Sequence, residues 1–204
     1  MAVRGGKLVR FRTICVLGLG YIGLPTASTF ANSGLQVTGV DVNERIVAGL
    51  RQGELHIEEP GLRTLVHAAL SSGNLRLAGQ PGPADAYLIA VPTPVLPDKR
   101  ADLGAVIAAA ESIVPHLRAG NLVVLESTSP PRTTVDTVAP ILERSGLRAG
   151  ADFHLAYSPE RVLPGQILRE LVENARVIGG VDRASAEAGS GRYCTWRSVV
   201  SPRL

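Results

Sequence analysis

Aromatic residues and cysteines are both scarce in this chain of 204 residues. Because only 4% of the residues are Phe, Trp or Tyr, the core must be built from Val, Leu, Ile and Ala, as it usually is around buried parallel strands. The two cysteines, Cys15 and Cys194, cannot form a disulfide framework in a chain of this size. Cys15 lies in an apolar run and is interpreted as a small core residue. A reducing, cytoplasmic environment fits this usage best.

Charged residues are missing from the 28 residues between Thr13 and Val40, which follow a basic N-terminus. Such a stretch raises the question of a signal peptide or a membrane span. Five glycines, together with Pro25, Asn32 and Gln36, divide it into short apolar runs. Neither a continuous signal core nor a spanning helix fits that pattern, because lipid leaves the breaks unsatisfied. No membrane partner is therefore expected.

The excess of basic residues lies at the two ends of the chain. The formal net charge is +3, but residues 1–12 and 190–204 together carry seven basic residues and no acidic one. Residues 13–189 therefore have a net charge of −4. We interpret the ends as solvated tails around a mildly acidic body, and no nucleic-acid partner is expected.

Short apolar runs alternate with longer amphipathic stretches, which is the pattern of β–α–β units around a parallel sheet. We predict an α/β protein with a Rossmann-type, doubly wound and mostly parallel sheet. It comprises a basic tail (1–11), one Rossmann domain (12–189) and an atypical, poorly ordered tail (190–204). Asp102 is the expected N-cap of the fourth helix. The predicted strands are 12–17, 35–41, 75–77, 86–91, 122–126, 153–157 and 177–178, and the predicted helices are 21–33, 44–51, 62–72, 103–117 and 133–145.

A G-x-G-x-x-G pattern directly follows the first predicted strand and opens a helix. Gly18 would permit the tight turn, Gly20 would let the backbone approach a pyrophosphate, and Gly23 would let the helix pack closely. Tyr21 and Ile22 occupy the two positions before Gly23. The pyrophosphate would meet free N–H groups and the positive end of the helix dipole. The alternative is a glycine-rich turn without a cofactor.

Asp41 is the residue that would distinguish NAD from NADP. It ends the second predicted strand, 18 residues beyond Gly23, where an acidic residue accepts hydrogen bonds from the adenosine ribose hydroxyls. Its negative charge would repel the extra phosphate of NADP. The pattern therefore predicts NAD as the cofactor, and residues 12–189 as an NAD-binding domain.

Polar residues follow three further predicted strands, on the side where open parallel sheets bind ligands. Pro92 and Thr93 follow 86–91, and Glu126 and Thr128 lie at the end of 122–126. These residues could line a nicotinamide pocket, or they could serve only as turn and capping residues. Glu160 follows 153–157 and is a candidate general acid, general base or water-orienting group. Its alternative is a solvated loop carboxylate.

Seven segments carry a family resemblance when they are taken together and in order. They are VLGLGYIGLPTA (16–27), GVDVN (39–43), IEEPGL (57–62), LIAVPTP (88–94), LESTSPPRTT (125–134), YSPERVLPG (157–165) and NARVIGG (174–180). Over about residues 12–185 the chain resembles the N-terminal part of the UDP-glucose/GDP-mannose dehydrogenase family. Within that family it is most similar to the UDP-N-acetyl-D-mannosamine dehydrogenases.

The resemblance implies a four-electron oxidation that uses two NAD for each nucleotide sugar, as in polysaccharide precursor synthesis. The 6-CH₂OH group of a UDP-hexosamine becomes an aldehyde and then a carboxylate. By the same resemblance, Thr128 holds the catalytic water and Glu160 acts in thioester hydrolysis, whereas Glu126, Pro92 and Thr93 lie near the nicotinamide. Pro164 stands where the UDP-glucose branch has a second acid. No metal site is expected, and full-length family members are expected to be homo-oligomers.

Family members are longer than this chain and carry a central helical segment and a C-terminal domain that supplies the thiol nucleophile and binds UDP. Cys194 lies in RYCTWR, outside the family's cysteine motif, and receives no catalytic role. We therefore expect a truncated member that represents the NAD-binding part.

Three alternatives stay open: an inactive NAD-binding module, another UDP-sugar dehydrogenase of the same family, or another Rossmann oxidoreductase. The last would be of the 6-phosphogluconate or 3-hydroxyacyl-CoA dehydrogenase type, and the VPTP, STSPP and SPER segments argue against it. Steady-state NADH production distinguishes an active dehydrogenase from an inactive module.

Overall fold

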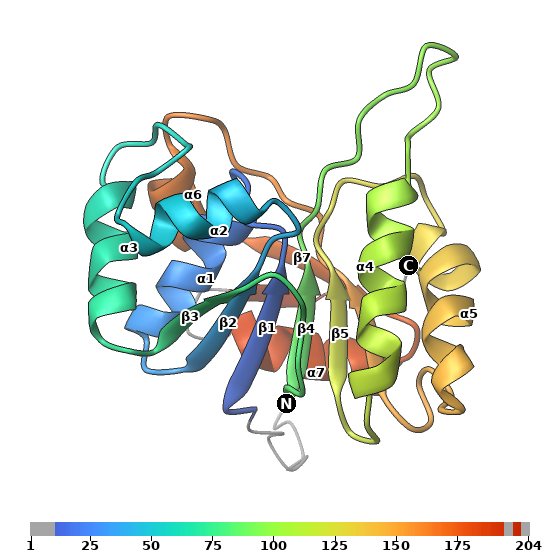
Figure 1. Ribbon diagram of the computed structural model, residues 1–204. Coiled ribbons are helices and arrows are strands. Elements are labelled where there is room, and N and C mark those ends of the chain that lie inside the picture. The colour runs from blue at the N-terminus through green and yellow to red at the C-terminus, as the bar shows by residue number, and fades with distance from the viewer. Residues whose placement is uncertain (1–10, 194–197, 201–204) are drawn as a thin grey trace.

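One eight-stranded sheet organises the computed structural model, which describes residues 11–193 and 198–200 (Figure 1). The strands are β1 (Thr13–Leu17), β2 (Gln36–Val40), β3 (Leu75–Ala78), β4 (Ala86–Ile89), β5 (Leu122–Leu125), β6 (His154–Tyr157), β7 (Arg176–Gly180) and β8 (Ser198–Val200). Their order in the sheet is β3-β2-β1-β4-β5-β6-β7-β8. The first six strands run parallel, whereas β7 is antiparallel to β6 and β8 is parallel to β7. The 3-2-1-4-5-6 order of the parallel strands is that of a Rossmann fold, so the predicted fold is confirmed.

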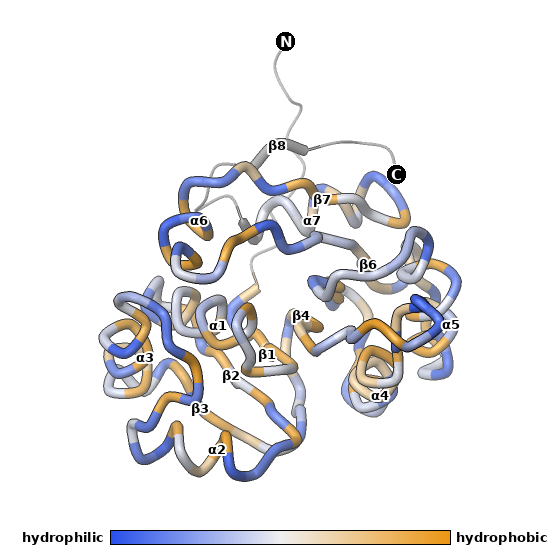
Figure 2. Tube along the Cα trace, turned by 90° about the horizontal axis from the view of Figure 1, so that it is seen from above, coloured by the Kyte–Doolittle hydropathy of each residue, from blue (hydrophilic) through white to orange (hydrophobic). Residues whose placement is uncertain are grey.

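Helices cover both faces of the sheet. They are α1 (Gly23–Asn32), α2 (Glu44–Arg51), α3 (Leu62–Ser71), α4 (Gly104–Ile113), α5 (Ala139–Leu142), α6 (Ile167–Glu173) and α7 (Arg183–Tyr193). Residues of α1, α3 and α7 pack on one face, and residues of α4 and α5 pack on the other (Figures 1 and 2). In the described part of the chain, no helix combines the length and hydropathy that a membrane crossing requires.

β1 lies in the middle of the sheet and divides the core by its alternation. Ile14 and Val16 belong to the buried cluster on the α1 side, whereas Cys15 and Leu17 belong to the cluster on the α4 side. Successive side chains of a strand point to opposite faces. From Ile14 to Leu17 the strand is apolar and buried at every position, so it is buried on both faces, as the sequence predicted.

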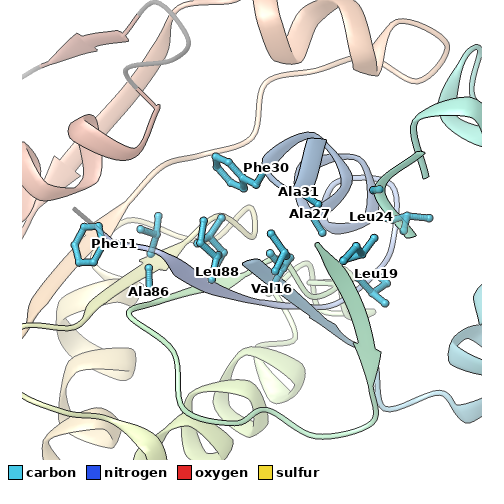
Figure 3. Packing of buried hydrophobic residues seen from close by; sticks show 14 of the residues in the cluster. Phe11, Val16, Leu19, Leu24, Ala27, Phe30, Ala31, Ala86 and Leu88 are labelled. Atoms are coloured by element: carbon cyan, nitrogen blue, oxygen red, sulfur yellow. The ribbon is translucent and has the colours of Figure 1, made fainter. Parts of the chain in front are cut away.

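Small side chains bring α1 close to the sheet. Ala27 and Ala31 are fully buried and lie in one cluster with Val16 and Leu88, as Figure 3 shows. Because this helix follows the glycine turn directly, its close packing also fixes the position of that turn beside the ends of the strands.

The predicted helix at 133–145 is present, but it is irregular. A π-helical turn (Thr134–Val138) precedes α5, and a 3₁₀ turn (Glu143–Ser145) follows it. Pro140 lacks a backbone N–H, so the regular helical ladder cannot pass through this position. Asp102 lies one residue before the position expected of an N-cap, since α4 begins at Gly104. Its carboxylate nevertheless accepts a hydrogen bond from the Gly104 N–H at 2.8 Å.

Two helices and one strand near the C-terminus were absent from the sequence prediction. α6 lies in the connection between β6 and β7. α7 continues to Tyr193, beyond the boundary expected at residue 189. A Cβ atom at Gly189 would lie 2.9 Å from a methyl group of Ile178, so this glycine marks close packing of a helix on β7 rather than the end of the fold. β8 lies within the segment expected to be a tail, whereas residues 1–10, 194–197 and 201–204 are outside the described residues.

Candidate cofactor and catalytic site

The loops after β1, β4, β5 and β6 lie side by side at the edge where the parallel strands end. Each loop begins with a backbone N–H that is hydrogen-bonded to a carbonyl of the neighbouring strand. These contacts are Gly18 N to Val40 O at 2.8 Å, Ala90 N to Leu17 O at 2.8 Å, Glu126 N to Ile89 O at 2.9 Å and Ser158 N to Leu125 O at 3.0 Å. The structure therefore brings the predicted residues of four loops to one edge of the sheet.

The three glycines of the first loop have different surroundings. Gly18 has a φ of +91°, and a Cβ there would lie 2.5 Å from the carbonyl oxygen of Ala90. A Cβ on Gly23 would collide with the carbonyl of Gly18, whereas a Cβ on Gly20 would have no protein atom within 4 Å. Gly18 and Gly23 are thus required by the fold, and Gly20 leaves open space over the backbone where a pyrophosphate would approach.

The start of α1 provides the groups that a phosphate needs. Ile22 precedes the helix, and no side chain among the described residues caps its first turn. The first N–H groups of a helix lack intrahelical partners and carry the positive end of its dipole. Tyr21, half exposed, lies in the same turn. The residues present therefore fit the pyrophosphate of a dinucleotide.

Asp41 lies directly beside this turn at the end of β2. One carboxylate oxygen accepts a hydrogen bond from the Leu19 N–H at 3.0 Å, and the other accepts one from the Asn43 N–H at 2.9 Å. The carboxylate is held at the glycine loop by two backbone donors and keeps further lone pairs for ribose hydroxyls. This position fits the role that the sequence predicts for Asp41.

Hydrogen bonds fasten the loops after β4 and β5 to each other. The Thr93 hydroxyl donates to the Thr128 carbonyl oxygen at 2.6 Å, and the Ser127 hydroxyl donates to the Val91 carbonyl oxygen at 2.7 Å. Pro92 and Thr128 are exposed, and Thr93 is half-buried. The predicted set Pro92, Thr93 and Thr128 therefore forms one surface at the strand ends.

Glu126, the first residue after β5, is fully buried. Its side chain accepts a hydrogen bond from the Arg176 guanidinium at 3.1 Å. The same guanidinium lies 3.7 Å from a carboxylate oxygen of Glu160, and the side chains of Arg176 and Glu160 are 9% and 8% exposed. Sequence reasoning missed Arg176, although a charge that opens the apolar run RVIGG was a usable signal.

Cys15 offers no nucleophile to this edge. It is the free cysteine of the described residues, its side chain is inaccessible to solvent, and it lies in the core cluster under α4. Burial raises the pKa of its thiol to about 12. Since the thiolate is the reactive form of cysteine, Cys15 is a core residue, as the sequence predicted.

The sheet order and the glycine turn define a class: this is a Rossmann-type dinucleotide-binding domain with polar groups gathered at the strand ends. Residues 12–197 match the NAD-binding domain of the UDP-glucose/GDP-mannose dehydrogenase family. The chain belongs to this family, and the NAD cofactor predicted from the sequence is confirmed.

Relatives share the sequence across most of the chain. The UDP-N-acetyl-D-mannosamine dehydrogenase of Methanococcus maripaludis is 50% identical over 186 residues, covering 89% of this chain and 42% of the relative. The NDP-N-acetyl-D-galactosaminuronic acid dehydrogenase of Ralstonia solanacearum is 49% identical, covering 91% and 45%. The solved UDP-N-acetyl-mannosamine dehydrogenase of Staphylococcus aureus superposes with a TM-score of 0.89 at 44% identity, covering 93% and 47%. The chain thus spans less than half the length of these relatives.

Proposed function

We propose that this chain supplies the NAD-binding and water-activating part of a UDP-N-acetyl-D-mannosamine dehydrogenase. The observation that carries the proposal is the placement of Thr128 and Glu160, which follow the adjacent strands β5 and β6 at the edge that also carries the glycine turn. The names of the relatives from Methanococcus maripaludis and Staphylococcus aureus support this substrate class. Another acetamido-sugar nucleotide is the second candidate, favoured by the relative from Ralstonia solanacearum.

The residues of this chain divide between two tasks in the proposed reaction. Gly20 and the first turn of α1 would hold the pyrophosphate of NAD, and Asp41 would hold the adenosine ribose. NAD, when bound, accepts the hydride that leaves the sugar carbon. Pro92 and Thr93 would bound the space for the nicotinamide, with Glu126 beneath them. These residues would thereby orient a bound cofactor at the ends of β4 and β5.

Thr128 and Glu160 would serve the hydrolytic step that releases the acid. The oxygen of water adds to the carbonyl carbon of a thioester, the carbon–sulfur bond breaks, and the proton of the water passes by way of Glu160 to the leaving thiolate. Thr128 would orient that water by hydrogen bonding. Because the Cys15 thiol is buried, the thioester would need a thiol from outside the described residues.

The test is NADH formation from NAD and UDP-N-acetyl-D-mannosamine, followed by absorbance. The 204-residue polypeptide would be assayed alone and with the remainder of the Methanococcus maripaludis relative supplied as a second polypeptide. We expect no sustained signal from the chain alone and about two NADH per sugar from the pair, as two hydride transfers require. UDP-glucose and UDP-N-acetyl-D-galactosamine would be run in parallel.

Two results would overturn the proposal. Sustained turnover by the chain alone that disappears in a Cys194→Ser variant would assign the thiol to Cys194. A pair that binds NAD but oxidises none of the three sugars would favour the inactive NAD-binding module.

A cytoplasmic location and a homo-oligomeric full-length protein belong to the same proposal, and size-exclusion chromatography of the pair would test the assembly.

A further inference from the structure

Arg176 lies between two carboxylates from different strand ends. One guanidinium nitrogen donates a hydrogen bond to Glu126 at 3.1 Å, and the other terminal nitrogen lies 3.7 Å from Glu160. All three side chains are at least nine-tenths buried, with exposed fractions of 9% for Arg176, 0% for Glu126 and 8% for Glu160. A buried charge is retained only where it is paired, and Arg176 forms an ion pair with each of the two carboxylates.

The direction of β7 explains how this arginine reaches the candidate site. β7 is antiparallel to β6, with Tyr157 opposite Gly179 and Ala156 opposite Gly180. The beginning of β7 therefore lies at the edge where β1 to β6 end. Arg176 is the first residue of β7, so this antiparallel strand delivers a cation to an edge otherwise built from the ends of parallel strands.

The loop that carries Glu160 is tied to the same strand entry. One carboxylate oxygen of Glu160 accepts a hydrogen bond from the Arg161 N–H at 2.6 Å, and the other faces Arg176. The side chain of Asn174, two residues before Arg176, donates to the Arg161 carbonyl oxygen at 3.1 Å. One oxygen of Glu160 therefore faces a backbone N–H, and the other faces a guanidinium.

We propose that Arg176 is a positioning residue whose guanidinium, anchored on buried Glu126, fixes the orientation of the Glu160 carboxylate at the candidate site. Only the expected effect on catalysis rests on the proposed function, because the contacts of Arg176 are all made within this chain. The planar guanidinium can address two carboxylates through separate nitrogens, whereas the single ammonium of lysine cannot match that fork. Arg176→Lys therefore keeps the charge and removes the geometry.

The first experiment uses the 204-residue chain alone and needs no activity. The backbone N–H of Arg161 reports on Glu160, because it donates to that carboxylate. In Arg176→Lys we expect its NMR resonance to shift and its protection from hydrogen exchange to fall on the order of tenfold, as for one lost charge-assisted hydrogen bond. The matched control is Arg169→Lys, at an arginine of α6 that is 69% exposed and paired with Glu173. An Arg161 signal unchanged in Arg176→Lys, in a chain that melts and binds NAD like the wild type, would overturn the proposal.

The second experiment adds the polypeptide that completes the proposed enzyme. With Glu160 displaced, we expect kcat to fall on the order of 100-fold, the effect of a catalytic group misplaced by about 1 Å, at unchanged KM for NAD. The initial burst of NADH, which forms before the first hydrolysis, should remain, because hydride transfer precedes hydrolysis. In a Glu160→Gln background Arg176→Lys should have no further effect, since the group that it positions is already lost.

The two proposals fail in different ways. Glu160→Gln without effect on steady-state NADH production would contradict the proposed role of Glu160 and leave the Arg161 signal to decide the role of Arg176. If kcat fell in Glu160→Gln but not in Arg176→Lys, the positioning role of Arg176 alone would be contradicted. Equal losses from Arg176→Lys with and without Glu160→Gln would assign Arg176 a purely structural role.

Discussion

Glu59 and Ile167 are 108 positions apart, and a carboxylate oxygen of Glu59 accepts a hydrogen bond from the Ile167 N–H at 2.7 Å. The other oxygen accepts one from the Gly165 N–H, also at 2.7 Å. These donors lie at the start of α6, where N–H groups lack helical partners and a negative charge is favoured by the helix dipole. The connection between α2 and α3 therefore fastens the segment that links Glu160 to α6.

A Glu59→Gln substitution should loosen that segment. The amide can accept only through one oxygen and without charge, so we expect the free energy of unfolding to fall by about 1–3 kcal/mol. Hydrogen exchange of Ile167 should accelerate more than exchange in β1. The control is Glu58→Gln at the exposed neighbouring glutamate. Equal urea unfolding curves for the two variants would show that the Glu59 contacts contribute nothing to stability.

Local rules predicted the parts of this fold that depend on neighbouring residues. The glycine turn, the strand that precedes it and Asp41 were found because a tight turn, a close helix approach and an acid at the next strand end have fixed spacing. Arg176 and Glu59 were not found, because their partners lie 50 and 108 positions away. Arg176 reaches the site because β7 runs antiparallel to β6. The short sequence of β7 does not reveal in which direction the strand runs.

The two glycines that differ most in surroundings give a paired prediction. Gly23→Ala places a methyl group against the Gly18 carbonyl, so we expect a loss of stability of at least about 1–3 kcal/mol from overpacking. Gly20→Ala adds a methyl group with no protein atom within 4 Å, so stability should change by less than about 0.5 kcal/mol.

NAD affinity should fall in Gly20→Ala although stability should hardly change. The added methyl group would occupy the space of the pyrophosphate, and affinity should fall by on the order of tenfold or more. Thermal melts and calorimetric titration with NAD measure the two quantities. Full NAD affinity in Gly20→Ala would mean that the cofactor does not cross this turn.

Cys15 gives a prediction for alkaline pH. Burial raises its pKa to about 12, so the folded protein holds the neutral thiol while the unfolded chain ionises above about pH 8.5. The stability that results is complete below that pH and is lost as the pH rises toward 12. Between pH 8 and 10.5 the wild type should therefore lose more stability than Cys15→Ala, at up to about 1.4 kcal/mol per pH unit. Urea unfolding at both pH values measures the difference, and parallel losses would contradict the raised pKa.

The reactivity of the same thiol provides an independent check. In a Cys194→Ser background, Cys15 is the remaining cysteine, and its reaction with a disulfide reagent at pH 8 should proceed only as fast as the protein opens. Urea at the unfolding midpoint should then accelerate labelling sharply. Rapid labelling of the native protein would show that Cys15 is accessible.

Asp41 gives the prediction that bears most directly on the cofactor. Its carboxylate is held against the glycine turn by the N–H groups of Leu19 and Asn43, so removing it affects both the ribose contact and the turn. We expect the wild-type chain to bind NAD more tightly than NADP, and Asp41→Ala to weaken NAD binding by about 1–3 kcal/mol through lost charge-assisted hydrogen bonds. Asp41→Asn separates the two effects, because the amide oxygen can keep one backbone contact while the charge that repels a 2′-phosphate is gone. NADP affinity should therefore rise relative to NAD in Asp41→Asn. Calorimetric titration of both cofactors into all three proteins tests this, and equal affinities of the wild type for NAD and NADP would contradict the assignment.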